Sequence, residues 1–167
     1  MNRPSPNEYP QWAEHYISLV EDDVLTVLER QGYEFPDYIN SLVEKADYAY
    51  APEKWTLKQL FGHMVDTERV FSYRIMSFAR GEQQALPGFD ENAYVDNAHF
   101  ADRSMFSLSE EFGLLRKSNM HLYKSLNDDE LTHVGTASGR QISVKAILFV
   151  AAGHLIHHTQ IIKERYL

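Results

Sequence analysis

The chain has 167 residues, 44% of them hydrophobic, no cysteine, and a formal net charge of −8 at pH 7. The length suits one domain (1–167) with a hydrophobic core, and the acidic balance disfavours nucleic acid and anionic membrane surfaces, which bind clustered lysine and arginine. The absence of cysteine excludes disulfides, thiolate metal sites and a cysteine nucleophile, so that any reactive thiol must arrive with a substrate.

The first half of the chain contains two segments in which hydrophobic residues recur at helical spacing. One helix is predicted from about residue 9 to residue 29, with Gly32 as its stop. A second is predicted over 57–79, with Gly81 just past its end. Between them, a short helix is expected around 38–46.

The second half contains two further helical segments, one over about 108–126 and one that begins at Ser143 as N-cap and continues almost to residue 167. The residues at 127–142 are expected to form a loop, because no convincing strand pattern is present. The long aromatic link 81–107 is interpreted either as a lid or as a crossover that lets its flanking helices run in the same direction. Four helices of about twenty residues predict an all-α four-helix bundle.

The stretch AAGHLIHHTQII near the C-terminus carries a candidate metal site. His154 and His158 are four residues apart, so on a helix they project from one face, as two ligands of one metal ion must. At 100° per residue they share a stripe with Ile147 and Ala151 that faces the bundle interior, whereas His157 falls at its polar edge. Interior histidines are also common as hydrogen-bonded core residues, and this spacing alone does not decide between the two interpretations.

A third ligand has to come from another helix, and His63 lies near the middle of the predicted second helix. The remaining histidines are poorer candidates, because His15 and His121 fall on polar faces and His99 and His133 lie in predicted loops. Three imidazoles with open coordination positions are typical of catalytic metal centres. Because imidazole must be neutral to bind metal, affinity should fall as pH drops through the ordinary histidine pKa of ~6.5.

Other metal chemistries find less support. No HExxH motif is present, and the only Glu-x-x-His match, Glu130 to His133, borders a predicted loop rather than an interior helix, which disfavours a di-iron bundle. On the third helix, Arg116 and Asn119 face inward and are candidates to line the site. An equally good interpretation is that Arg116 pairs with Glu68 or another acid across helices, and both interpretations stay open.

Three motifs together resemble the DinB-like (damage-inducible) four-helix bundle superfamily of metal-dependent enzymes. They are YAPEKWTLKQLFGHMVDTERVFSYR, ARGEQQALPGFDENAYV and AAGHLIHHTQIIKERYL, in this order from about residue 50 to residue 167. The resemblance implies an up-down-down-up bundle with a long crossover between helices two and three. It also implies one nickel or zinc ion on His63, His154 and His158, and a homodimer.

The resemblance further suggests an activity, because branches of this superfamily include bacillithiol-dependent S-transferases and a mycothiol-dependent maleylpyruvate isomerase. We therefore expect a metal-dependent transferase that activates a low-molecular-weight thiol and acts on a small-molecule substrate. One alternative is a hydrolase with metal-bound water and Glu68, Asp66 or Asp90 as base. The other is a stress-related metal-binding bundle without turnover. The N-terminus lacks the apolar segment of a signal peptide, so a cytoplasmic location is expected.

Overall fold

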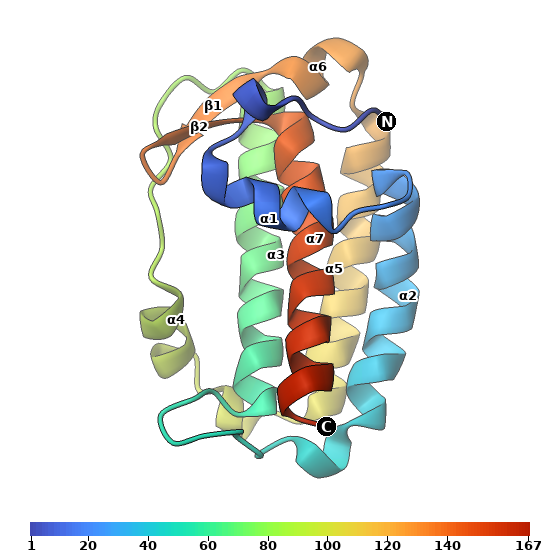
Figure 1. Ribbon diagram of the computed structural model, residues 1–167, viewed down its shortest axis with the longest axis vertical. Helices are drawn as coiled ribbons and strands as arrows, with labels where there is room; N and C mark the ends of the chain where they lie inside the picture. Colours follow the sequence, from blue (N-terminus) through green and yellow to red (C-terminus); the bar gives the residue numbers. More distant parts are fainter.

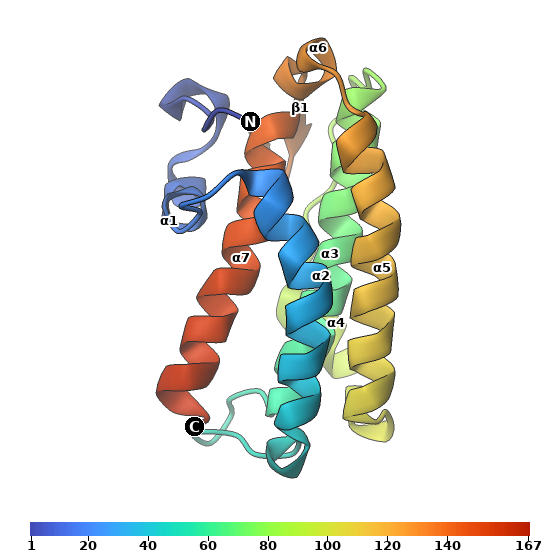
Figure 2. The same ribbon diagram turned by 90° about the vertical axis from the view of Figure 1, so that its right-hand side faces the viewer.

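The computed structural model describes residues 1–167 and contains four long helices that lie side by side as a bundle (Figure 1, Figure 2). They are α2 (Val24–Ser41), α3 (Leu57–Ala79), α5 (Met105–Ser125) and α7 (Val144–Arg165). α2 and α7 run in one direction and α3 and α5 in the other, which confirms the predicted all-α bundle with up-down-down-up order. None of these helices combines the length and apolar character that crossing a bilayer requires.

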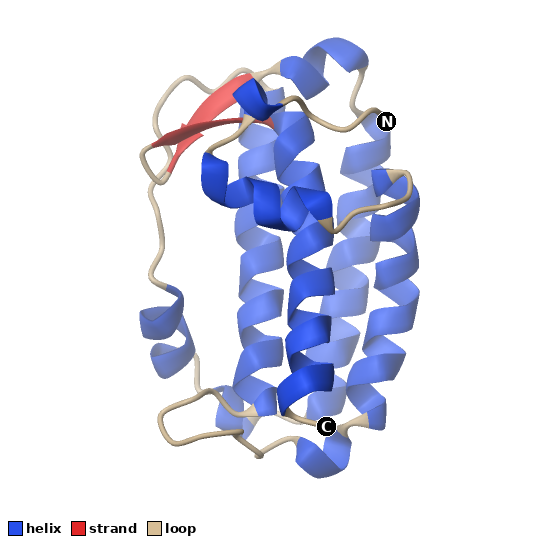
Figure 3. Cartoon of the chain, in the orientation of Figure 1, coloured by secondary structure: helices blue, strands red, loops and turns tan.

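Short elements connect and flank the long helices (Figure 3). They are α1 (Glu14–Ser18), α4 (Glu91–Asn97), α6 (Asp128–Thr132), the strands β1 (Val134–Ala137) and β2 (Arg140–Ser143), and the 3-10 turns Pro6–Glu8, Gln11–Ala13, Val43–Lys45 and Phe100–Asp102. α1 lies against the upper half of α7, where both views place it beside that helix.

The helix starts follow from capping residues. Thr56 accepts a hydrogen bond from the Gln59 amide, and the Gln59 side chain accepts one from the Thr56 amide, so a capping box begins α3 at the predicted residue. Ser143 likewise accepts from the Ala146 amide and starts α7, as predicted. Gly81, with φ of 82°, follows the end of α3 in the left-handed conformation that glycine adopts without strain.

The first predicted helix is wrong in its bounds. The chain leaves helical conformation after Ser18, and a new helix starts at Val24 because the Asp23 carboxylate accepts the Thr26 amide. This helix, α2, continues through Gly32 and Pro36 to Ser41, so the separate helix expected around 38–46 is its last turn followed by a 3-10 turn.

Tertiary packing explains why α2 does not stop at Gly32. A Cβ on Gly32 would lie 3.1 Å from Cγ of Arg116, and one on Gly113 would lie 3.2 Å from Cγ of Pro36. The two glycines therefore let α2 and α5 approach closely. This packing outweighs the helix-breaking tendency of glycine and proline.

The predicted loop at 127–142 is also wrong, because it contains α6 and an antiparallel hairpin of β1 and β2. Val134 pairs with Ser143 and Ala137 with Arg140, which leaves a two-residue turn at 138–139. Both turn residues have positive φ, 52° at Ser138 and 73° at Gly139, as tight hairpin turns require. Four-residue strands are too short to produce a strong alternating pattern in the sequence.

Of the two interpretations of the link between α3 and α5, a lid or a crossover, the structure shows the crossover. It descends beside the bundle from the hairpin end to the start of α5 and contains α4 (Figure 1). Phe100 of this link is buried against α3, where a Cβ on Gly62 would lie 2.4 Å from its ring. Gly62 is therefore required by the crossover, one residue before His63.

The buried side chains form two hydrophobic clusters, one toward the hairpin and one toward the C-terminal end of α7. Between them, α2, α3 and α5 contribute hydrogen-bonded polar side chains to what we call the polar layer. Its members are Gln31, Glu68, Arg116 and Asn119. The layer lies at mid-height in the bundle.

Arg116 is 1% exposed and is fully paired within this layer. Its Nε and Nη2 donate to the two carboxylate oxygens of Glu68, each at 2.8 Å, and its Nη1 donates to Oε1 of Gln31 at 2.8 Å. Asn119 donates to Glu68 at 2.8 Å, and Gln31 donates to the Ala152 carbonyl of α7 at 2.9 Å. The network thus ties all four helices together.

Removing one charge of this pair should be far more harmful than removing both. In Arg116→Met, Glu68 is left buried without its cation, and we expect the free energy of unfolding to fall by about 3–5 kcal/mol. In Glu68→Gln/Arg116→Met no charge is buried, and at least about half of that loss should be recovered. Urea unfolding of the metal-free proteins measures both; a double variant no more stable than the single one would contradict this account.

Candidate metal centre

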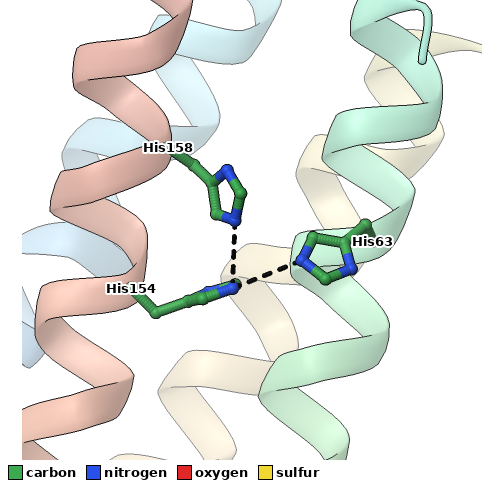
Figure 4. A group of neighbouring side chains, drawn as sticks. All are labelled: His63, His154 and His158. Carbon is green, nitrogen blue, oxygen red and sulfur yellow. Dashed lines mark hydrogen bonds between the residues drawn. The ribbon is translucent and has the colours of Figure 1, made fainter. Parts of the chain in front are cut away.

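Three imidazoles meet beside the polar layer (Figure 4). His63 projects from α3, while His154 and His158 project from successive turns of α7. Nε2 of His154 lies 3.3 Å from Nε2 of His63 and 3.1 Å from Nε2 of His158. One nitrogen from each ring lies within 4.8 Å of the others, so the structure brings together the three residues predicted as ligands.

The donor set fits a divalent metal ion better than it fits hydrogen bonding alone. A ring nitrogen is either a donor or an acceptor, with one in-plane position, yet Nε2 of His154 faces two other nitrogens. At most one of these contacts is therefore a good hydrogen bond, whereas a cation can accept a lone pair from all three. Tetrahedral zinc, with Zn–N bonds of ~2.0–2.1 Å, would separate neighbouring ligand nitrogens by about 3.3 Å.

Aromatic side chains enclose the three rings. The ring centroid of Trp55 lies 4.9 Å from that of His63, and those of Tyr16 and Phe71 each lie 5.7 Å from that of His154. Tyr16 reaches this position because α1 crosses α7 at Gly153, where an added Cβ would lie 2.0 Å from the Tyr16 carbonyl oxygen.

Burial lowers the pKa of all three ligand candidates. Desolvation disfavours the imidazolium form and lowers the pKa of His63 to about 4 and that of His158 to about 3. The pKa of His154 falls well below its ordinary value for the same reason, and repulsion from the neighbouring imidazoles adds to it. All three rings are therefore neutral at pH 7, with lone pairs free for a metal. The pH below which protons compete for these rings is lower than the ~6.5 expected from the sequence.

The other histidines lie outside this group. His157 faces His15, with 3.1 Å between Nδ1 of His157 and Nε2 of His15. His133 lies 3.2 Å from the Phe78 carbonyl, His99 begins a 3-10 turn, and His121 is exposed on α5. Around the helix, His158 lies about 40° from His154 on one side and His157 about 60° on the other. The two neighbours are thus about 100° apart and lie in different environments.

None of the other predicted site residues reaches the three rings by a hydrogen bond. Arg116, Asn119 and Glu68 bind one another in the polar layer, which is the ion-pair interpretation left open above. Asp66 lies 3.8 Å from Arg69 in an ion pair. Asp90 caps α4 by accepting the amides of residues 92 and 93.

The sequence interpretation missed Glu91, which follows Asp90 at the start of α4. Its charge raises the pKa of His63 against the effect of burial and also raises the pKa of Tyr16, so it is the carboxylate that acts on this centre. Both acids are present in the LPGFDE motif, as Asp90 and Glu91. The sequence alone does not show which of them caps a helix and which acts on the histidines. Trp55 lies within the YAPEKWTLK motif, but nothing in its spacing indicates that it forms a wall of the site.

Comparison with known proteins agrees with the four-helix bundle fold. A model of the DinB superfamily matches residues 28–162. The chain belongs to the DinB superfamily. Among solved structures, the DinB-family chain is similar to YfiT from Bacillus subtilis, described as "a probable metal-dependent hydrolase with an unusual four-helix bundle topology". The TM-score is 0.73 at 18% sequence identity, over 98% of this chain and 93% of YfiT. No curated protein sequence matches it.

Metal binding should depend on three histidines and not on their neighbours. We expect one divalent metal ion per chain, with affinity reduced more than about 100-fold in His63→Ala, His154→Ala and His158→Ala. His157→Ala should reduce the affinity less, by at most the ~10–100-fold typical of outer-shell partners, and His121→Ala, at an exposed position, should leave the affinity unchanged.

Tryptophan fluorescence measures this binding. Trp12→Phe leaves Trp55 as the single tryptophan, so Ni²⁺ quenching of its fluorescence reports binding. Loss of binding in His157→Ala but not in His158→Ala would refute the assignment.

The depressed pKa values also predict a pH dependence of stability. Unfolding returns His63 from a pKa of about 4 to ~6.5, so the unfolded chain binds more protons between these values and stability falls as pH decreases through this window. His63→Asn lacks this group. The wild-type free energy of unfolding, measured with chelator, should therefore fall more steeply than that of His63→Asn, by up to about 1.4 kcal/mol per pH unit. Equal slopes between pH 6.5 and pH 4.5 would show that His63 is not buried as a neutral ring.

Proposed function

We propose that this DinB-family chain is a metal-dependent enzyme that transfers a low-molecular-weight thiol to a small electrophile. The observation that carries the proposal is the group of three neutral, converging imidazoles in a site enclosed by aromatic rings. A nickel or zinc ion bound there would act as a Lewis acid that lowers the pKa of a coordinated thiol, so that thiolate exists near neutral pH.

The residues of the chain have defined tasks in this proposal. His63, His154 and His158 hold the ion and leave coordination positions open, and the rings of Trp55 and Phe71 limit the access of water. The chain has no cysteine that would compete for the ion. In the reaction, the thiol sulfur forms a bond to the electrophilic carbon, the bond from that carbon to its leaving group breaks, and the thiol proton passes to solvent.

The positions of the carboxylates favour a thiol over water as the nucleophile. Hydrolysis benefits from a general base, and the predicted bases Asp66, Glu68 and Asp90 are engaged in an ion pair, the polar layer and a helix cap. A coordinated thiol loses its proton far more readily than water and needs no such base.

Hydrolysis remains a second candidate because of Glu91. Its carboxylate acts electrostatically on His63 and is exposed, so it is free to accept a proton from water at the centre. The description of YfiT as a probable metal-dependent hydrolase supports this candidate.

One comparison separates the two activities. Protein loaded with nickel or zinc is assayed for consumption of 1-chloro-2,4-dinitrobenzene with bacillithiol, mycothiol, glutathione or cysteine, and for hydrolysis of 4-nitrophenyl acetate without thiol. We expect thiol transfer to be lost in His158→Ala and retained within about twofold in Glu91→Gln. Hydrolysis that is lost by at least about 100-fold in Glu91→Gln, with no thiol transfer, would favour the hydrolase.

Absence of both activities in protein that binds one metal per chain would instead favour a non-catalytic metal-binding bundle. The homodimer implied by the family resemblance stays a prediction, which light scattering of the metal-loaded protein measures.

A further inference from the structure

A cavity of about 270 Å³ adjoins the metal centre between the segment before α3 and the last turns of α7. Its apolar walls include Tyr50, Trp55, Leu60, Ile161 and Tyr166, and His158 completes them. We propose that this cavity, which we call the aryl pocket, binds an uncharged aromatic group of the substrate. The inference rests on the proposed function, because it places the electrophile beside the centre that activates the nucleophile.

The aryl pocket and the metal centre share walls. His158 lines the pocket while its Nε2 faces His154, and Trp55 lines the pocket while its ring lies 4.9 Å from that of His63. Nδ1 of His158 is buried without a hydrogen-bond partner and points away from the three converging nitrogens (Figure 4). This buried nitrogen therefore adds no polar atom to the surface of the pocket, which leaves the wall at His158 apolar.

The walls are held in place before any ligand binds. The Tyr166 hydroxyl donates to the Trp55 carbonyl at 2.8 Å, and burial raises the pKa of Tyr166 to about 12, so this donor stays protonated. The Tyr50 and Tyr166 rings meet edge to face at 5.2 Å, and the Arg165 guanidinium lies 5.4 Å from the Tyr50 ring centroid. A preformed aromatic wall loses little entropy when it binds a flat ring.

Charge and size narrow the class of ligand. Glu53 and Lys54 at the pocket carry opposite charges, and Asn92 is neutral, so the pocket has no net charge with which to select an ion. The volume lies just below the ~300 Å³ at which pockets for drug-sized ligands begin, so the pocket suits a small group. The aromatic walls, the lack of net charge and this volume together favour a small uncharged aromatic group.

Hydroxamates test the pocket separately from the metal centre, because the hydroxamate group chelates the ion and its substituent probes the neighbouring space. With nickel-loaded wild-type protein, we expect benzohydroxamate to bind at least about tenfold more tightly than acetohydroxamate in calorimetric titrations. A 4-carboxybenzohydroxamate should lose this advantage, because it would bring a charge into an apolar pocket.

Two variants test whether the tighter binding of benzohydroxamate comes from this pocket. Ile161→Trp fills the space and Tyr50→Ala removes a wall, and both should bring the ratio of benzohydroxamate to acetohydroxamate affinity toward one while acetohydroxamate affinity stays within about twofold. Leu114→Trp, at an exposed position of α5, should leave the ratio unchanged. Equal affinity of the two hydroxamates for the wild type overturns the aryl pocket and leaves the metal centre intact. Failure of both to bind overturns the open metal centre and the pocket with it.

Discussion

The buried pair of Arg116 and Glu68 is the interaction on which the rest of the structure depends. A guanidinium 1% exposed to solvent is tolerated only with its charge paired and its donors satisfied, and here α2 and α3 supply the partners of Arg116 on α5. These hydrogen bonds have one correct register, whereas hydrophobic contacts between helices can slide. The pair therefore specifies how the helices align, and the carbonyl of Ala152 extends that alignment to α7.

The metal centre depends on this alignment because its three rings come from two helices. His154 lies two residues after Ala152, whose carbonyl is fixed by the polar layer, and His63 lies little more than one turn before Glu68 on α3. A shift of one helix along the other would separate the Nε2 atoms that now lie 3.1–3.3 Å apart. The polar network thus positions the imidazoles without a hydrogen bond to any of the three rings.

Burial of the three histidines has an unfavourable desolvation energy, and it also keeps their rings in the neutral form that binds metal. Desolvation keeps His63 and His158 neutral far below pH 7, so the ligands need not lose protons when metal binds. The Trp55 ring covers His63 on one side and limits the access of water. The same ring forms a wall of the aryl pocket, which leaves room beside the centre for a substrate group. Two glycines allow other segments to pack closely around the centre. Gly153 lets α1 approach α7 next to His154, and Gly62 lets the crossover approach α3 next to His63.

Local periodicity and capping in the sequence determined where α3 and α7 begin, which face of α7 is buried, and that His158 rather than His157 points inward. Each of these properties depends on residues within a few positions of one another. Only the tertiary structure decided that α2 continues through Gly32, that 134–143 forms a hairpin, that the charge of Glu91 acts on His63, and that the aryl pocket adjoins the metal centre. These features depend on contacts between residues far apart in the chain, whose packing energies outweigh local propensities and leave no periodic pattern in the sequence.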